Sequence, residues 1–325
     1  MIEVRDLNKS FDDKIIFQNA NLNIEENRIY GLFARNGVGK TTLLKILADQ
    51  LVNYQGQISY NNKSIRENKD YKKRVLLVGE DFISETLKPE RLNKIMDLIY
   101  ILLENFNKER FEELIDIFAI DMKTRYRKLS FGNQCLFRNA IGLASGADFL
   151  FFDEPTTGLD EINKDNFYKK LMEYQDKDES TVVISSHNVA DIEKMITDVI
   201  ILKDKKVIIN EPIYGVEEKS YSITLDPKDL DMLASKNVIS KNVFANQVIA
   251  SVYDDFTEEE LLALRQKASI SRLNLRDLFI AINNEEVWYE KYKKIVEIRN
   301  KILFSLFFNI CWNLNCFRKY FWPTS

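Results

Sequence analysis

The spacing of apolar residues in the first fifty positions predicts two kinds of strand followed by a helix. Apolar and polar residues alternate at Ile2–Val4 and Ala20–Ile24, a pattern typical of edge strands. Arg28–Phe33 is a more continuous apolar run, which predicts a buried central strand. Thr42–Leu51 carries leucine and isoleucine at helical spacing. The glycine-containing segment in between therefore joins a buried strand to the start of a helix.

Three later runs predict the rest of a parallel sheet. Val75–Val78, Phe149–Phe152 and Thr181–Ser185 are short and apolar or β-branched, as expected of strands that helices cover on both faces. Pro89–Ala119 has no glycine and places leucine and isoleucine at helical spacing. We therefore expect an α/β domain with a helical subdomain inserted at about residues 81–145.

A closing hairpin and a change of pattern mark the end of this domain. Val199–Leu202 and Val207–Ile209 predict the hairpin, so the first domain is expected to cover residues 1–215. Residues 216–284 predict a small α+β accessory region. Its expected elements are strands at Tyr221–Leu225 and Val248–Val252, a helix starting at Asp226-Pro227, and a capping box at Thr257–Glu260.

The last segment, residues 285–325, has a different composition. Ile302–Phe317 contains no charged residue, but these sixteen positions are fewer than the ~20 that span a bilayer. Lysine and arginine precede and follow them, which is consistent with a segment lying at a membrane surface. A docked or disordered C-terminal extension explains the same pattern equally well.

Composition excludes few function classes but gives no support to a dedicated nucleic-acid binder. The 46 basic and 50 acidic residues give a net charge of −4, without the basic excess expected of such a protein. The N-terminus lacks the basic start and apolar run of a secretory signal, so a cytoplasmic location is expected. Cys135, Cys311 and Cys316 have no paired spacing, which fits a reducing compartment.

The segment Ala34–Thr42 has the features of a phosphate-binding loop. Backbone N–H groups at a helix N-terminus bind clustered negative charge, and Gly37 and Gly39 allow the backbone to approach a triphosphate closely. Lys40 is expected to reach the β- and γ-phosphates, and the Thr41 hydroxyl to bind Mg²⁺. The residues expected to bind ATP here are Asn36, Gly37, Val38, Gly39, Lys40, Thr41 and Thr42.

Two strand ends supply further candidate chemistry. Asp153 directly follows an apolar run, and a carboxylate at the end of a strand can hold Mg²⁺ against phosphates. Glu154 is the next residue and is expected to face an attacking water. Two acids at a strand end are also compatible with a merely solvated terminus. His187 follows the run Thr181–Ser185, although a lone histidine is commonly a surface or packing residue.

A further motif, Leu129–Gln134, reads Leu-Ser-Phe-Gly-Asn-Gln and lies between the glycine loop and the two acids. With Phe149–Pro155 and His187, these motifs occur in a fixed order. In this order the chain resembles the ATP-binding subunit of an ABC transporter. The resemblance implies a P-loop NTPase fold, with an N-terminal antiparallel β subdomain and an inserted helical subdomain, and it covers residues 1–215 most strongly.

The resemblance also implies roles for individual residues. Glu154 would be the general base, and His187 the switch histidine that contacts the γ-phosphate and positions water. Asp160 would be the acid of the D-loop. Ser130 and Gly132 would donate hydrogen bonds to ATP held by a second subunit, although Ser130 could instead be a simple helix N-cap.

Several positions depart from the family pattern. Ala34 replaces the first loop glycine, at a cost on the order of 1 kcal/mol if the position needs positive φ. Glu80 stands where a glutamine usually senses Mg²⁺, and Phe131 and Asn133 replace glycine and glutamine. Phe11 lies where an aromatic ring stacks on adenine, with a plain core phenylalanine as the alternative.

These features favour one function over two alternatives. We expect a Mg²⁺-dependent ATPase subunit of a bacterial exporter that handles a peptide, bacteriocin or drug. It would bind at the cytoplasmic face of the membrane to a separate permease, as a homodimer or as a heterodimer with a second ABC ATPase. A soluble ABC ATPase acting on ribosomes or nucleic acid is the first alternative, and a degenerate, binding-only subunit is the second.

Overall fold

A computed structural model describes residues 1–244 and 246–284 of the 325-residue chain. The chain divides into two compact units, one covering Met1–Val216 and the other beginning at Glu217. The expected membrane-surface segment within residues 285–325 lies outside the described residues. Within the described part of the chain, no helix combines the length and the apolar character needed to cross a membrane.

The first unit begins with an antiparallel sheet in the order β2-β1-β4-β5. β1 pairs with both β2 and β4, so the prediction that the first run is an edge strand was wrong. The alternation is real, but it reflects one buried face within a separate sheet rather than a position at the edge of the central one. The strands are β1 (Ile2–Phe11), β2 (Lys14–Ile24), β4 (Gln55–Tyr60) and β5 (Lys63–Ser64).

A six-stranded sheet in the order β10-β9-β3-β8-β7-β6 forms the centre of this unit. All neighbours are parallel except the β9–β10 pair, which is the expected hairpin. Every residue of β3 is buried, as the continuous apolar run predicts. The strands are β3 (Ile29–Phe33), β6 (Val75–Val78), β7 (Phe149–Asp153), β8 (Thr181–Ser186), β9 (Asp198–Lys203) and β10 (Lys206–Pro212).

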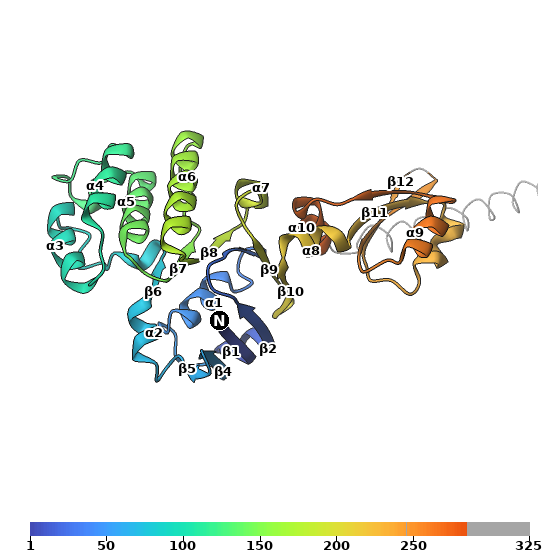
Figure 1. The fold of residues 1–325 in the computed structure, drawn as a ribbon, viewed down its shortest axis with the longest axis horizontal. Helices are drawn as coiled ribbons and strands as arrows, with labels where there is room; N and C mark the ends of the chain where they lie inside the picture. The colour runs from blue at the N-terminus through green and yellow to red at the C-terminus, as the bar shows by residue number, and fades with distance from the viewer. Residues whose placement is uncertain (245, 285–325) are drawn as a thin grey trace, which may run out of the picture. The chain divides into compact units, whose positions relative to one another are not determined.

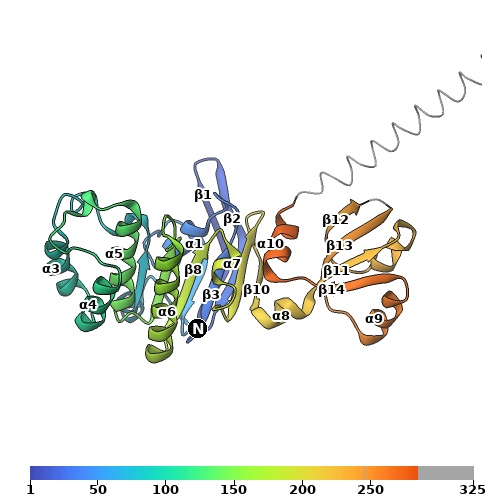
Figure 2. The ribbon, with the colours of Figure 1, turned by 90° about the horizontal axis from the view of Figure 1, so that it is seen from above.

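Helices cover both faces of this sheet (Figure 1). α1 and the antiparallel sheet lie on one face, where they share a continuous apolar core with β3, β7 and β9. α6 and α7 lie on the other face, and α3, α4 and α5 gather at the β6 end of the sheet (Figure 1); Figure 2 shows α3, α4 and α5 grouped together from a second side. The helices are α1 (Lys40–Leu47), α2 (Lys69–Arg74), α3 (Leu92–Leu102), α4 (Lys108–Ile117), α5 (Phe131–Ala144), α6 (Glu161–Asp178), α7 (Val189–Ile192) and α8 (Ile213–Lys219).

The second unit is a small antiparallel sheet in the order β12-β13-β11-β14. The capping box is present: the Thr257 side chain accepts a hydrogen bond from the Glu260 N–H, and the Glu260 side chain accepts one from the Thr257 N–H. The expected helix after Asp226 is a 3₁₀ helix, Pro227–Leu233, rather than an α-helix. The other elements are β11 (Ser220–Leu225), β12 (Val238–Phe244), β13 (Gln247–Tyr253), α9 (Glu258–Arg265), β14 (Ala268–Arg272) and α10 (Leu275–Asn283).

Candidate nucleotide site

The glycine loop joins β3 to α1, with Gly39 as the residue that precedes the helix. Gly37 and Gly39 have φ angles of 78° and 126°, which L side chains rarely adopt. A Cβ at Gly39 would also lie 2.7 Å from Ile16 Cγ2 on β2, so only glycine fits there. The loop borders a cavity of about 410 Å³ lined by Lys14, Ile16, Arg35, Asn36, Gly37, Gly39, Lys40, Thr41, Thr42 and Glu154.

The alanine that replaces the first loop glycine is not strained. Ala34 is buried and does not belong to the residues with positive φ, so the expected conformational cost is absent. Its carbonyl accepts a hydrogen bond from Lys40 Nζ at 3.2 Å. This bond holds the lysine side chain folded back over the loop, where its ammonium group also lies 3.1 Å from Glu154 Oε1.

Asp153 connects three segments that are far apart in the sequence. The Thr41 hydroxyl on α1 donates to Asp153 Oδ2 at 2.5 Å, and the Ser185 hydroxyl on β8 donates to Asp153 Oδ1 at 2.6 Å. Since β7 and β8 are parallel neighbours, their carboxyl ends meet at the same edge of the sheet. The two acids of the strand end are therefore organised and not merely solvated.

Glu154 lies between a cation and a histidine. Its Oε1 is 3.1 Å from Lys40 Nζ and its Oε2 is 2.7 Å from His187 Nδ1. Its backbone has φ of 52°, uncommon for a residue other than glycine, asparagine or aspartate. The Glu154 N–H donates to Ser185 Oγ at 3.0 Å, which helps to hold this conformation. The structure thus brings Lys40, Glu154 and His187 into one cluster.

The residues beside the loop fit a magnesium ion held together with phosphates. Mg²⁺ in nucleotide sites takes one or two protein oxygens, with phosphates and water completing the octahedron. The Thr41 hydroxyl and the Asp153 carboxylate, in contact at 2.5 Å, are such a pair. Within the described residues, no group of three or more acidic, histidine or cysteine side chains is placed to hold a metal by itself.

Glu80 is the predicted metal residue with the least structural support. It begins a 3₁₀ turn, Glu80–Phe82, after β6. A Cβ at the preceding Gly79 would lie 3.5 Å from Asp153 Cβ, so the backbone before Glu80 passes beside that acid. In this chain Asp81, not Glu80, forms the ion pair with α1, to Lys45 at 2.8 Å, and this bond lowers the pKa of Asp81.

The remaining predicted residues lie on other parts of the unit. Ser130 caps α5, where its Oγ accepts from Asn133 N at 3.2 Å, and Asp160 caps α6 in the same manner. A Cβ at Gly132 would lie 2.9 Å from the Gly158 carbonyl, so the two motifs are in contact. Phe11 is 44% exposed, which excludes the alternative that it is a core phenylalanine.

Comparison with known proteins identifies the domain that carries this site. The profile described as "ABC transporter" matches residues 17–157, a range that includes the glycine loop, the Leu129–Gln134 motif and both acids. The chain contains an ABC transporter ATP-binding domain. The α/β P-loop NTPase fold is confirmed, because solved ABC cassettes share it.

The relatives of this ABC domain are diverse. The ABC transporter ATP-binding protein YtrB of Bacillus subtilis is 26% identical over 64% of this chain and 70% of its own length. The lantibiotic transport ATP-binding protein SrtF of Streptococcus pyogenes is 25% identical over 67% and 93%. The dimeric, post-hydrolysis MJ0796 cassette bound to ADP and phosphate shares the fold, with a TM-score of 0.56 and 21% identity over 65% and 98%.

Reasoning from the sequence missed Ser185 as a residue of the ABC nucleotide site. Its hydroxyl links Asp153 to the Glu154 backbone, yet it was read only as the end of an apolar strand. The available signal was the pair Ser185-Ser186, two hydroxyls ending a run that is otherwise apolar or β-branched. Lys14 and Ile16, which also line the cavity, belong to no motif, and Arg35 lies in the Ala34–Thr42 loop but was given no role.

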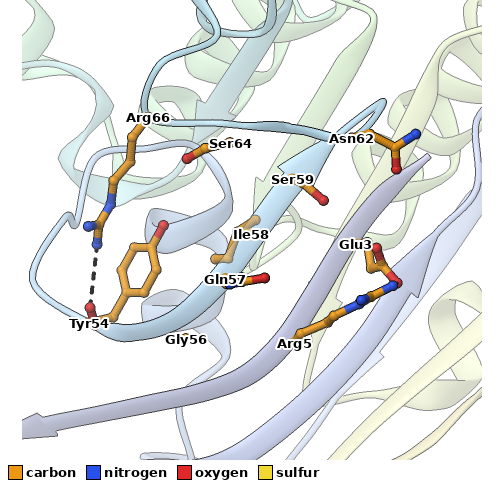
Figure 3. Close-up of a pocket in the computed structure, with 10 residues that line it drawn as sticks. All are labelled: Glu3, Arg5, Tyr54, Gly56, Gln57, Ile58, Ser59, Asn62, Ser64 and Arg66. Carbon is orange, nitrogen blue, oxygen red and sulfur yellow. Dashed lines mark hydrogen bonds and ion pairs between the residues drawn. The ribbon is translucent and has the colours of Figure 1, made fainter.

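A second hollow in the ABC domain is separate from this site. It has a volume of about 390 Å³, and none of its lining residues belongs to the predicted nucleotide site. Figure 3 shows Arg5 and Arg66 on opposite sides of it, with Arg66 bonded to the Tyr54 carbonyl. The Arg66 guanidinium also lies 4.1 Å from the Tyr54 ring centroid, so it is already engaged by its own chain.

Proposed function

We propose that this chain is the ATP-hydrolysing subunit of a bacterial ABC exporter whose permease is a separate chain. The observation that carries the catalytic part of the proposal is the position of Glu154. Its carboxylate contacts the loop lysine on one side and His187 on the other. A general base needs such placement next to the phosphates, and a binding-only subunit does not.

Binding of ATP would rearrange this cluster. The phosphates attract Lys40 away from Glu154, because a triphosphate carries more charge than one carboxylate. Glu154 Oε1 is then free to accept a proton from water. The water oxygen bonds to the γ-phosphorus as the bond to the β-phosphate oxygen breaks, releasing ADP and phosphate. His187 would contact the γ-phosphate from the end of β8 and keep the water in line.

Magnesium has a defined place in this proposal. Thr41 and Asp153 would hold the ion, and Glu80 would lie further out, beyond Gly79. When bound, Mg²⁺ neutralises developing charge on the phosphate oxygens. Ser185 would keep the Asp153 carboxylate oriented through the bond to Oδ1.

A second subunit would complete each site. Ser130 and Gly132 lie at the N-terminus of α5, where N–H groups favour binding of a phosphate. They would donate to ATP held by the glycine loop of the partner, with Asp160 at the same interface. Two ATP molecules would thus be enclosed between two ABC ATPases, either two copies of this chain or this chain and a related one.

The transport part of the proposal rests on similarity and on the helical region. SrtF is named as a lantibiotic transport protein, which supports a peptide-like cargo. The α3 helix exposes Leu98, Ile101 and Leu102, the last two at more than 70%, and this inserted helical region would contact the permease. The subunit would then be peripheral, at the cytoplasmic face of the membrane.

The test uses a variant that binds ATP without hydrolysing it. Glu154→Gln, tagged and purified from the source cells in Mg-ATP, should retain the closed dimer and its partners. Lys40→Ala is the matched control, because it loses the phosphate contact and should not close. Recovery of a multi-span membrane protein with Glu154→Gln alone supports the exporter. Recovery of ribosomes or DNA-binding proteins instead would overturn the exporter in favour of the soluble alternative.

A further inference from the structure

Two buried side chains on α5 converge on one backbone oxygen. Asn139 Nδ2 donates to the Pro155 carbonyl at 2.7 Å, and Cys135 Sγ donates to the same oxygen at 2.9 Å. Both side chains are 2% exposed. Burial also raises the pKa of the Cys135 thiol, which keeps it protonated and able to donate. The Pro155 carbonyl is therefore held by α5 away from water.

Pro155 directly follows Glu154, whose backbone has the uncommon φ of 52°. Residues in such conformations persist only where the surrounding structure holds them. On its N-terminal side, Glu154 is held by the bond from its N–H to Ser185 Oγ. On its C-terminal side the Glu154 carbonyl accepts a hydrogen bond from the Thr157 N–H at 3.3 Å, and the proline ring fixes φ of Pro155. Holding the Pro155 carbonyl therefore also restricts the peptide that follows Glu154.

The two anchors fix where the Glu154 carboxylate lies. With both sides of the backbone held, the side chain reaches Lys40 and His187 at 3.1 and 2.7 Å. Without the α5 anchor, the segment could relax toward an ordinary φ and carry the carboxylate away. A displacement of about 1 Å in a group that must face an attacking water can lower a rate about a hundredfold.

We infer that Asn139 is a positioning residue for ATP hydrolysis, which holds Glu154 in place through the Pro155 carbonyl. The inference rests on the proposed function. It ties the general base to α5, the helix that Ser130 caps and whose first turn contains Gly132. Asn139 itself would touch neither ATP nor water, because it is buried against Pro155 and Cys135.

The test separates kcat from ATP binding. Asn139→Leu keeps the volume and removes the amide donor, so we expect kcat to fall about tenfold while the Kd for ATP changes less than about twofold. Tyr71→Phe is the matched control, since it removes another buried bond to a carbonyl, Tyr71 to Leu47, also at 2.7 Å. It should destabilise the protein to a similar extent and leave kcat unchanged.

A rescue variant addresses the mechanism directly. Cys135→Ser in the Asn139→Leu background places a stronger donor against the Pro155 carbonyl and should recover part of the lost kcat. Asn139→Ser, which is too short to reach Pro155, serves as a second variant in case Asn139→Leu does not fold; normal ATP binding shows that each variant is folded.

The possible failures are distinguishable. If the parent chain hydrolyses ATP and folded Asn139→Leu or Asn139→Ser does so at the same rate, the positioning role alone is overturned. The same conclusion would follow if Tyr71→Phe lowered kcat as much. A parent chain that shows no hydrolysis dependent on Glu154 would overturn the proposed function, and this inference with it.

Discussion

Lys40 Nζ and Glu154 Oε1 lie 3.1 Å apart, so the cation expected to bind phosphate is paired with the carboxylate expected to activate water. Lys40 is also 7% exposed and bonded to the Ala34 carbonyl. The Glu154 carboxylate and an ATP phosphate would therefore compete for the same Lys40 ammonium group. Binding of ATP must break this pair, and the cost of breaking it lowers the affinity for ATP.

The first prediction concerns this pair. Glu154→Gln removes the charge that competes with the phosphates for Lys40, so ATP should bind at least as tightly as to the parent. Hydrolysis should fall by about 10²–10⁴-fold, because the general base is lost. Equilibrium binding and phosphate release measure the two effects. Glu161→Gln, at an exposed acid on α6, is the control, and weaker ATP binding by Glu154→Gln would contradict the competition.

The second prediction compares two glycines of the loop. Gly39→Ala should lower both stability and ATP affinity, because its Cβ would meet Ile16 Cγ2 at 2.7 Å and φ is 126°. Gly37→Ala has positive φ as well, but nothing lies within 4 Å of its Cβ. It should therefore cost only conformational strain, about 1 kcal/mol. Thermal unfolding with and without ATP distinguishes the two; equal losses would show that the contact with Ile16 is unimportant.

Local features of the sequence predicted much of this site. The glycine loop is one continuous segment between a buried strand and a helix, so its position followed from hydrophobic pattern and composition. The same was true of Asp153, which ends a strand that the apolar run defined. The continuous runs were also correct for the parallel strands, because strands buried on both faces leave an unambiguous pattern.

Contacts between distant segments could not be predicted. Ser185 is 31 positions from Glu154, and Asn139 is 16 from Pro155, so nothing local in the sequence pairs them. The strands that pair with β1 could not be predicted from its own sequence either. Its alternation showed that one face is buried, but not that it pairs on both sides. The cost at Ala34 depended on a positive φ at that position, and φ there is set by the whole loop and is not positive.

The third prediction tests the serine that the sequence did not reveal. Ser185→Ala removes the donor to Asp153 Oδ1 and the acceptor for the Glu154 N–H. We expect kcat to fall about tenfold and the Mg²⁺ concentration for half-maximal activity to rise, since the hydrogen bond from Ser185 would orient the carboxylate that holds the metal. Ser145→Ala removes another buried hydroxyl, bonded to Ala147 N at 3.2 Å, and should change neither quantity. Parent-like Mg²⁺ dependence in Ser185→Ala would contradict this role.

The fourth prediction concerns Cys135, whose thiol is buried and has a raised pKa. Because alkylation requires the thiolate, the raised pKa and the burial both slow the reaction at pH 8. In a Cys311→Ser/Cys316→Ser background, iodoacetamide should label native Cys135 at least about a hundredfold more slowly than an unfolded cysteine, and normally in denaturant. Adding Asn139→Leu should accelerate labelling, because the segment that covers the thiol loses an anchor. Mass spectrometry measures the extent of labelling. Rapid labelling of the native parent would show instead that the α5–Pro155 contact opens readily.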